Sequence, residues 1–304
     1  MKYEQTSWVA AALMVFAGTA WGNGIAVPDI AISTEAPASL GSVNFENDAL
    51  VAYDPDTNAA LQVFDLGDQF GIIRNLDAAH ILPNGHVVIS TQAGDTVAGV
   101  AFTESDLVEL DPVNGTASLL LDASAVGLVI PSNLPQINGV HVRDNGHILF
   151  SIAANPGVTF KGGTYTKADI IEYDPINDTA SLFFDGSAIT GVNGFDADVR
   201  GFAVIDDDHV LLAAFDVATG SAMTLGGVSF TRDDLVLYNF GVPVVRVGSG
   251  DAGTSGSATL FMEGLNEFSA PGEIIDAVTQ AVVPEPASAV LLLMAGGLAR
   301  RRRA

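Results

Sequence analysis

Oxygen-bearing side chains alternate in the run DPDTN at residues 54–58, in the spacing of a calcium-binding loop. The three candidate ligands are Asp54, Asp56 and Asn58. A calcium loop of this type also needs Gly at its sixth position and Glu at its twelfth, where this chain has Ala59 and Asp65. Proline presets the backbone of a turn, and Asp and Asn cap its amides, so the run favours a turn. We expect no cofactor at this run, with calcium as the alternative.

Two histidines stand at equivalent positions of a repeated pattern, His80 in DAAHIL and His141 in NGVHV. Imidazole nitrogens bind transition metals, so two of them close together could hold one. The matching positions in the two other repeats are Ala203 and Thr279, however, and a metal site needs a third ligand and supporting hydrogen bonds. We therefore favour structural histidines over a metal site.

Familiar catalytic signatures are missing from the sequence. No Gly-x-Ser-x-Gly elbow and no His-Glu-x-x-His pair occurs. The run GSGDAG at residues 248–253 matches a dinucleotide-binding fingerprint, but it opens no predicted helix and carries an acid where pyrophosphate would lie. Carboxylates are plentiful, yet no local pattern separates a general acid from the rest. The sequence predicts a protein that is not an enzyme.

The candidate ligands and histidines named above belong to a repeated pattern. The run DIIEYDPINDTASLFFD at residues 169–185 recurs as DLVELDPVNGTASLLLD at 106–122 and as DALVAYDPDTNAALQVFD at 48–65. A fourth copy begins at Asp233, is interrupted after Asn239 by a Gly/Ser-rich insertion, and resumes as SATLFMEG. Each copy is two apolar runs joined by a turn, which predicts two adjacent strands.

A second pattern lies between these copies, at residues 77–91, 138–152 and 200–214. Each segment passes from a short apolar run through Asn-Gly or Asp-Asp to a histidine and a second apolar run. The three histidines are His86, His147 and His209. Asn-Gly and Asp-rich pairs between apolar runs indicate a β-hairpin with a primed turn, which needs positive φ. Because these histidines recur with the repeat, the repeat accounts for them.

Four antiparallel strands in a repeat of about 60 residues are typical of a β-propeller blade. PDIAIST at residues 28–34 has the pattern of a second strand without a first, and EIIDAVTQAVV at 273–283 that of a first strand without a second. Pairing these two segments would complete a blade and close the ring. The sequence therefore predicts an all-β, propeller-like domain of four repeats over residues 24–283. An open array, or a five-bladed ring that uses residues 241–258, is the alternative.

The composition limits the partners of this domain. The chain has 304 residues, no cysteine and a net charge of −24, so disulfides and thiolate metal sites are excluded. Without Lys2, Glu4 and the four arginines near the C-terminus, the remainder carries 35 acidic and 7 basic side chains. Such a surface repels phosphate backbones, which argues against nucleic acid as a partner.

The N-terminal segment, residues 1–22, has the pattern of a signal peptide. Lys2 precedes an apolar run from Trp8 to Gly22 that is too short to span a bilayer. Small residues near its end predict cleavage between Gly22 and Asn23. We therefore expect the protein to be exported.

The C-terminal segment, residues 284–304, combines three features in order. A Pro-Glu-Pro motif comes first, the apolar run ASAVLLLMAGGLA follows, and a basic tail ends the segment. The motif is Pro284, Glu285 and Pro286, and the tail is Arg300, Arg301, Arg302 and Arg303. The apolar run is shorter than the roughly 20 residues of a transmembrane helix, and the arginines would keep the tail on the cytoplasmic side. We expect a transient membrane insertion.

This C-terminal arrangement resembles the PEP-CTERM sorting signal of Gram-negative bacteria. In that family, an exosortase, a membrane-bound processing enzyme, recognises the motif, the hydrophobic segment and the basic tail. The resemblance covers residues 283–304 and implies that Pro284, Glu285 and Pro286 are the recognition residues. The repeats, with runs such as DIIEYDP and SLFFDGS, are similar to the secreted propeller-like domains of unassigned function that often carry this signal. Such proteins are associated with surface display and with extracellular polysaccharide or biofilm matrix.

Three classes of function remain. The preferred one is an exported, non-enzymatic structural or adhesive component of the cell surface or of an extracellular polysaccharide matrix. A glycan- or calcium-binding module is the alternative, although both tryptophans, Trp8 and Trp21, lie in the signal segment. A secreted propeller hydrolase is the third, and it would need carboxylates or histidines that converge on the channel mouth with a metal. The expected partners are an exosortase-type enzyme and extracellular polysaccharide.

Overall fold

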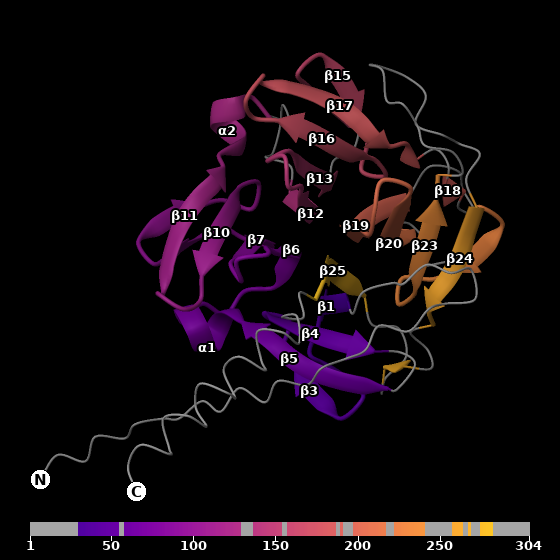
Figure 1. Cartoon of the computed structure of the whole chain (residues 1–304), viewed down its shortest axis with the longest axis horizontal. Coiled ribbons are helices and arrows are strands. Elements are labelled where there is room, and N and C mark those ends of the chain that lie inside the picture. Colours follow the sequence, from indigo (N-terminus) through magenta and orange to yellow (C-terminus); the bar gives the residue numbers. More distant parts are fainter. Residues whose placement is uncertain are drawn as a thin grey trace, which may run out of the picture. The chain divides into compact units, whose positions relative to one another are not determined.

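The computed structural model describes ten stretches of the chain, and a compact unit covers residues 27–282. The described stretches are 30–54, 58–128, 136–153, 157–186, 189–190, 197–216, 222–240, 257–263, 267–268 and 274–281. Four antiparallel sheets of four strands each form the blades of a ring (Figure 1). The fold is a four-bladed β-propeller. This confirms the prediction from the repeats and excludes the two alternatives, an open array and a five-bladed ring.

The blades follow the repeats in order, and the strands of each blade run from the centre of the ring outward. The first blade is β25 (Ile275–Gln280), β1 (Ile30–Thr34), β4 (Ala49–Asp54) and β5 (Ala59–Asp65). The second is β6 (Leu76–Ile81), β7 (Val87–Thr91), β10 (Leu107–Asp111) and β11 (Thr116–Leu121). The third is β12 (Gln136–Val142), β13 (Ile148–Ala153), β16 (Ile170–Asp174) and β17 (Thr179–Phe184). The fourth is β19 (Ala197–Val204), β20 (His209–Asp216), β23 (Leu235–Asn239) and β24 (Ser257–Met262).

The burial of the strands follows from their place in the blade. The second strands β1 and β7 are buried at every position, because they are covered on both faces by neighbouring blades. The outer strand β11 has only Leu121 buried, and β17 only its last two residues. Between the third and fourth blades the core is aromatic, with Phe183, Phe184, Phe202, Phe230, Tyr238 and Phe240 in one cluster. These large rings fill the widening gap between two blades.

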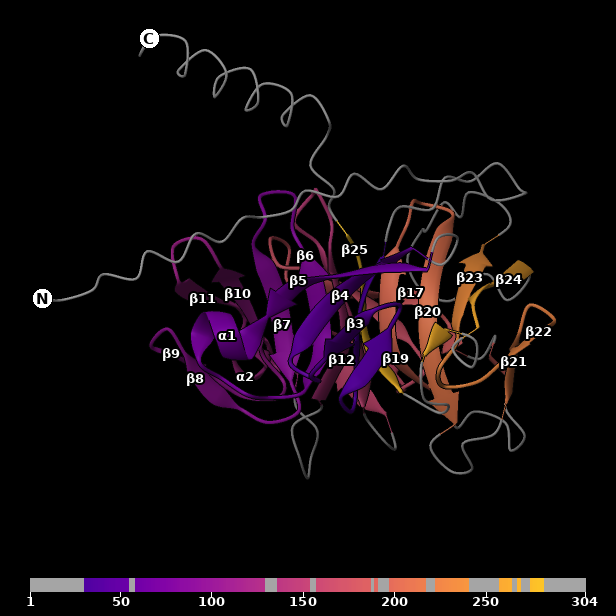
Figure 2. The same ribbon diagram turned by 90° about the horizontal axis from the view of Figure 1, so that it is seen from below.

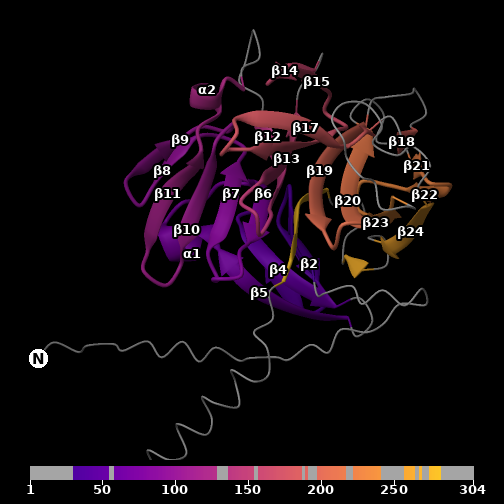
Figure 3. The ribbon, with the colours of Figure 1, turned by 45° about the horizontal axis from the view of Figure 1, so that its top comes forward.

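The ring is closed by the two ends of the domain. β25 pairs antiparallel with β1, with Ile32 opposite Val278 and Ile30 opposite Gln280. This confirms the predicted pairing of the two incomplete segments. Figure 3 shows β25 between β6 and β19, the inner strands of the two neighbouring blades.

The narrow centre depends on small residues in the inner strands. A Cβ added to Gly139 would lie 2.7 Å from the Phe202 ring, and one added to Gly201 would lie 3.0 Å from Val278. Ala78 and Ala277 occupy the matching positions of β6 and β25. A ring of four blades brings its inner strands close together, and only Gly or Ala fits at that level.

The connection between the second and third strand of each blade contains an additional hairpin, which the sequence analysis did not predict. The four pairs are β2 (Ala38–Leu40) with β3 (Val43–Phe45), β8 (Asp95–Val97) with β9 (Val100–Phe102), β14 (Val158–Phe160) with β15 (Gly163–Tyr165), and β21 (Met223–Leu225) with β22 (Val228–Phe230). The short β18 (Ile189–Thr190) joins the last pair. Figure 2 shows β8–β9 and β21–β22 at opposite sides of the ring's perimeter.

Two short helices, α1 (Leu66–Phe70) and α2 (Ala123–Val126), were not expected from the sequence. Each begins after the closing aspartate of a repeat, and the carboxylates of Asp65 and Asp122 accept hydrogen bonds from the amides of Asp68 and Ala125. Each helix ends at a glycine with positive φ. The closing aspartates are therefore helix caps in the first two repeats.

The predicted hairpins between first and second strands are confirmed, but their turns belong to another class. In the β6–β7 turn, the amide of Gly85 donates to the Leu82 carbonyl at 2.9 Å. Gly85 (φ +84°) and Gly146 (φ +82°) take positive φ, whereas the asparagine before each does not. The side chain of Asn84 accepts the amide of His86 at 2.9 Å instead. These are type I turns closed by a left-handed glycine, not two-residue primed turns.

Replacing Gly146 with Val should lower the free energy of unfolding by about 1–2 kcal/mol, because a β-branched residue is strained at positive φ. A Cβ at this glycine would meet nothing within 4 Å, so the cost lies in the backbone alone. Urea denaturation measures it. Gly146→Asn is the matched control and should cost less, since Asn tolerates the left-handed region. Equal midpoints for the Val and Asn variants would contradict the turn assignment.

Several predicted features lie outside the described residues. They are the signal segment with Gly22 and Asn23, the insertion at 241–256, the Pro-Glu-Pro motif, the apolar run after it and the arginine tail. Within the described stretches, no helix is long and apolar enough to cross a membrane.

Candidate functional site

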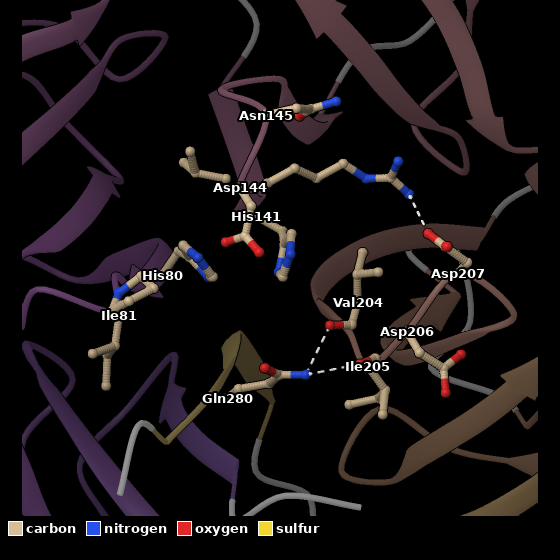
Figure 4. Close-up of a pocket in the computed structure, with 13 residues that line it drawn as sticks. His80, Ile81, His141, Asp144, Asn145, Val204, Ile205, Asp206, Asp207 and Gln280 are labelled. Atoms are coloured by element: carbon tan, nitrogen blue, oxygen red, sulfur yellow. Dashed lines mark hydrogen bonds and ion pairs between the residues drawn. The ribbon is translucent and has the colours of Figure 1, made fainter. Parts of the chain in front are cut away.

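The four inner strands bring one residue each to the same level of the central channel. As predicted, the residues are His80 on β6, His141 on β12, Ala203 on β19 and Thr279 on β25. The rings of His80 and His141 lie 4.4 Å apart between centroids and are tilted by 54°. Both side chains are buried, and Figure 4 shows the two rings beside each other at the pocket.

His80 is held by the fold. Its Nδ1 lies 3.3 Å from the Thr279 hydroxyl, which also accepts the Ile81 amide at 3.1 Å. Burial lowers the pKa of His80 to about 4, and a hydrogen bond with the backbone of Val142 opposes this shift. The imidazole is therefore neutral at pH 7.

His141 differs from His80 in one respect. Its Nδ1 is buried and has no hydrogen-bond partner among the described residues. Burial lowers the pKa of His141, and the neighbouring His80 and Arg143 lower it further. A neutral imidazole with an unpartnered nitrogen can accept or donate one hydrogen bond.

A pocket of about 510 Å³ opens in front of the two rings. We call it the mouth pocket, and it is lined by His80, Ile81, Pro83, His141, Val142, Arg143, Asp144, Asn145, Val204, Ile205, Asp206, Asp207 and Gln280. The lining comes from the end of β25 and from the β6–β7, β12–β13 and β19–β20 hairpins. The Gln280 amide donates to the carbonyls of Val204 (2.9 Å) and Ile205 (3.4 Å), which ties β25 to the fourth blade (Figure 4).

The rim of the mouth pocket is acidic. Its one arginine, Arg143, pairs with Glu172 at 3.5 Å and with Asp207 at 4.0 Å, and its guanidinium lies 5.2 Å from the Phe183 ring centroid. The lining itself carries the carboxylates of Asp144, Asp206 and Asp207. The rim therefore has an excess of negative charge.

A polar cluster, which the sequence reasoning missed, lies further along the inner strands. Each inner strand contains a register shift, and the residues at the shifts are Asp77, Asn138, Arg200 and Asp276. A β-bulge re-aims the side chain of its extra residue. The signal was present in the sequence, since each of these polar residues directly precedes the small residue that permits close packing.

The cluster is held by buried hydrogen bonds and ion pairs. Asn75 donates to Asp276 at 2.8 Å and to Asp77 at 3.3 Å. Arg200 pairs with Asp198 at 3.3 Å and with Asp276 at 3.4 Å. Three carboxylates thus surround one guanidinium, so the cluster cannot be neutral with all of them ionised.

The surplus of carboxylates shifts their protonation. Burial, followed by repulsion from Asp276, raises the pKa of Asp77 to about 8. Burial also raises the pKa of Asp276 to about 6, with Arg200 opposing the shift, and it raises the pKa of Asp198. Asp77 is therefore largely protonated at pH 7.

The histidines of the second pattern have structural partners. His86 lies 2.6 Å from Glu109 and 3.4 Å from Asp111, and His147 contacts Glu172 at 2.9 Å. In the fourth blade the strand positions opposite are Leu237 and Asn239, and there His209 contacts Asp206 at 2.7 Å instead. These pairs join the second strand of a blade to its neighbours, as the repeat suggested.

The candidate calcium run behaves as a turn in the copies that the structure describes most fully. Asp111 accepts the amides of Val113 and Asn114, and Asp174 accepts those of Ile176 and Asn177. In the first copy Asp54 ends β4 and Asn58 has a φ of +52°, while Asp56 lies outside the described residues. Over the described stretches, no three histidine or carboxylate side chains form a group that could hold a metal ion.

No family model and no curated protein matches this chain. Among solved structures, the extracellular domain of a putative one-component system from B. thetaiotaomicron is 10% identical with a TM-score of 0.30, over 81% of this chain and 24% of that one. A structure of YCF48 bound to D1 peptide is 10% identical with a TM-score of 0.31, over 71% and 48%. A protein of unknown function from Bacteroides caccae is 12% identical with a TM-score of 0.36, over 82% and 84%. This chain spans less than half of the first two, and likeness at this level carries no argument about function.

Proposed function

We propose that this protein is an exported, non-enzymatic propeller that is sorted to the cell surface or the extracellular polysaccharide matrix and has a structural or adhesive role there. One observation carries the proposal. The strand that closes the ring, β25, ends at Gln280, and the Pro-Glu-Pro motif starts four residues later, at Pro284. Cleavage at the motif would therefore release a body whose ring-closing strand is intact.

The spacing also suits the processing step. Proline fixes its own φ angle and disfavours a helical conformation in the residue before it, so Pro284 and Pro286 favour an extended segment. An accessible, non-helical segment would suit a membrane-bound processing enzyme of the exosortase type. The arginine tail would hold the chain at the membrane until cleavage.

The non-enzymatic part of the proposal is supported by the lining of the mouth pocket. Its thirteen residues include no Ser, Thr, Cys, Lys or Tyr, so no hydroxyl, thiol or amine nucleophile lines it. Its carboxylates, Asp144, Asp206 and Asp207, are all exposed to solvent rather than held in a buried pair. His80 is no free base, since its Nδ1 lies beside the Thr279 hydroxyl and its ring has a hydrogen bond with the backbone of Val142. A glycan-binding module is the second candidate, and the mouth pocket is the observation that favours it.

Mass spectrometry of the protein recovered outside the cell tests the sorting step. We expect a mature chain that begins at Asn23 and ends near Pro284–Pro286, when the gene is expressed in a Gram-negative host that has an exosortase. A Glu285→Ala variant is the matched control and should keep the whole C-terminal segment. A secreted wild-type form that still ends in RRRRA would overturn the proposal.

A further inference from the structure

The ring closes where β25 meets β6 of the second blade, and this contact is made by side chains. β25 pairs through its backbone with β1, whereas β6 belongs to a separate sheet. Asn75, which directly precedes β6, donates to Asp276 at 2.8 Å. At the other end of the contact, the Ile81 amide donates to the Thr279 hydroxyl at 3.1 Å. We call this contact between β25 and β6 the closing seam, and its polar part is buried.

Two carboxyl groups share one amide at the closing seam. The Nδ2 of Asn75 donates to Asp276 on β25 at 2.8 Å and to Asp77 on β6 at 3.3 Å. Both aspartates are buried, with Asp77 3% exposed and Asp276 fully enclosed. Two carboxylates that lie on one amide nitrogen and are shielded from water repel each other strongly if both are ionised, so such a pair retains a proton. We call Asp77 and Asp276 the carboxyl pair.

The cation of the cluster does not remove this repulsion. The Arg200 guanidinium lies 3.4 Å from Asp276 and 3.3 Å from Asp198, so it is divided between two carboxylates. Both distances exceed the roughly 2.7–2.9 Å of a charge-assisted hydrogen bond. Among the described residues, no cation lies within ion-pair distance of Asp77. The carboxyl pair therefore keeps an uncompensated charge when it is fully ionised, and a proton neutralises it.

The other charged groups around the carboxyl pair add to the repulsion. Glu35, which follows β1, and Asp198 on β19 both act against ionisation of the pair. Lys167 acts on Asp198, and β12 contributes the uncharged Asn138, which donates to Asp198 at 3.0 Å. Burial, followed by the charge of its partner, raises the pKa of Asp77 to about 8, and Arg200 opposes the shift. The shared proton is therefore lost under mildly alkaline conditions.

We propose that the carboxyl pair is a proton-operated latch, which holds the closing seam shut while the shared proton is in place and allows β25 to separate from β6 when alkaline pH removes it. The proton leaves a carboxyl oxygen for water, and no other bond is broken. In the open seam both carboxyl groups reach solvent and titrate near the ordinary value of about 3.9. Between that value and about pH 8 the closed seam holds a proton that the open seam releases. The fraction of open seam therefore rises by up to about tenfold per pH unit over this range and levels off above it.

Hydrogen exchange of the purified protein, measured by mass spectrometry at pH 6 and pH 8, tests the latch. Each rate is divided by the rate of an unstructured peptide at the same pH, which removes the intrinsic pH dependence of exchange. We expect the amides of β25 and β6 to be less protected than those of β13 in the third blade, because the seam opens locally. Their protection should fall by about tenfold or more from pH 6 to pH 8.

Variants of the carboxyl pair assign the response to the shared proton. Asp77→Asn should keep the seam protected at pH 8, because an amide needs no proton. Asp276→Asn should also remove the pH response, and the double variant should remove no more than either single one, since one proton serves both groups. Asp207→Asn is the control for charge, because its side chain is 98% exposed, and it should respond like the wild-type protein. A melting scan shows that each variant is folded, and if Asp276→Asn does not fold, Asp77→Asn decides alone.

Carbon-13 NMR of the aspartate carboxyl groups observes the proton directly. The resonances of the pair are assigned by their absence in the two single variants. We expect one of them to titrate near pH 8 in the wild-type protein. In Asp276→Asn the titration of Asp77 should move to lower pH by about one unit or more, since its repelling neighbour is gone.

Several outcomes would overturn the latch. Equal protection of β25, β6 and β13 at both pH values would mean that the ring opens as a whole and not at the seam. Protection of the seam that stays constant from pH 6 to pH 8, or that falls equally in Asp77→Asn, would mean that no proton of the pair operates it. Two carboxyl groups that both titrate below pH 5 would show that the pair is fully ionised in the closed ring.

Discussion

Deleting Glu273 to Val283, and with them β25, should lower the melting temperature of the domain by about 10 °C or more. β25 buries Ile275, Ala277 and Val278 completely or almost so, and its loss leaves β1 with an unpaired edge. Removing several buried side chains from a core costs about 3–5 kcal/mol, and each kcal/mol is worth about 2–4 °C in a domain of this size. The deletion also removes Thr279 from His80 and Gln280 from the β19–β20 turn.

A truncation after Pro286 is the matched control, since it removes the sorting segment and keeps β25. Differential scanning calorimetry of the two proteins makes the comparison. We expect the control to melt like the longer protein and the deletion to melt early or aggregate through the free edge. Equal melting temperatures would mean that the ring does not depend on the pairing of β1 with β25.

The ring was predictable because the pattern of apolar runs repeats with the blades. In β13, for example, ILFSIA is an apolar run broken only by Ser151, it follows the Asn145-Gly146 turn closely, and the structure buries all but its last residue. The missing partner strands at the two ends of the domain then fixed the closure. Both inferences use only the pattern of apolar runs. The structure follows this pattern because each blade is covered on both faces, which buries the strands along their length.

The hairpins between the second and third strands were not predicted, because the residues at their turns are weak signals of a turn. The positive-φ pairs are Ala98-Gly99, Lys161-Gly162 and Gly226-Gly227, and neither Ala nor Lys is a usual residue for that region. The strands they join are three residues long, too short for an alternating pattern. Similarly, α1 and α2 are too short for a helical period, and only their capping aspartates marked them.

The site was predictable in part. Equivalent positions in the repeat were enough to bring His80 and His141 together, because inner strands of a propeller face one channel. The acidic rim was not predictable, since Asp144 and Asp207 belong to turns of different blades and line one pocket only when the ring forms. The buried cluster around Arg200 was hidden because a bulge, not the strand period, aims these side chains.

Replacing Asp77 with Asn should stabilise the domain near pH 8 by about 2 kcal/mol or more, because the folded protein binds a proton there that the unfolded chain releases. The pKa of Asp77 is raised to about 8 in the folded state by burial and by Asp276. An ordinary aspartate in the unfolded chain titrates near pH 3.9. Between these values the unfolded chain binds fewer protons than the folded one, so the stability of the wild-type protein falls as the pH rises.

The amide of the variant needs no proton and keeps the geometry, since its oxygen can still accept from Asn75. The stability gained by Asp77→Asn should therefore be small at pH 4, grow between pH 4 and pH 8, and level off above that. Urea unfolding at a series of pH values measures this gap, the difference in the free energy of unfolding between Asp77→Asn and the wild-type protein. Asp207→Asn is the control, because its side chain is 98% exposed and removes the same charge without burial. A gap that stays constant with pH, or that Asp207→Asn reproduces, would show that Asp77 is ionised in the folded protein and that the cluster carries its full negative charge.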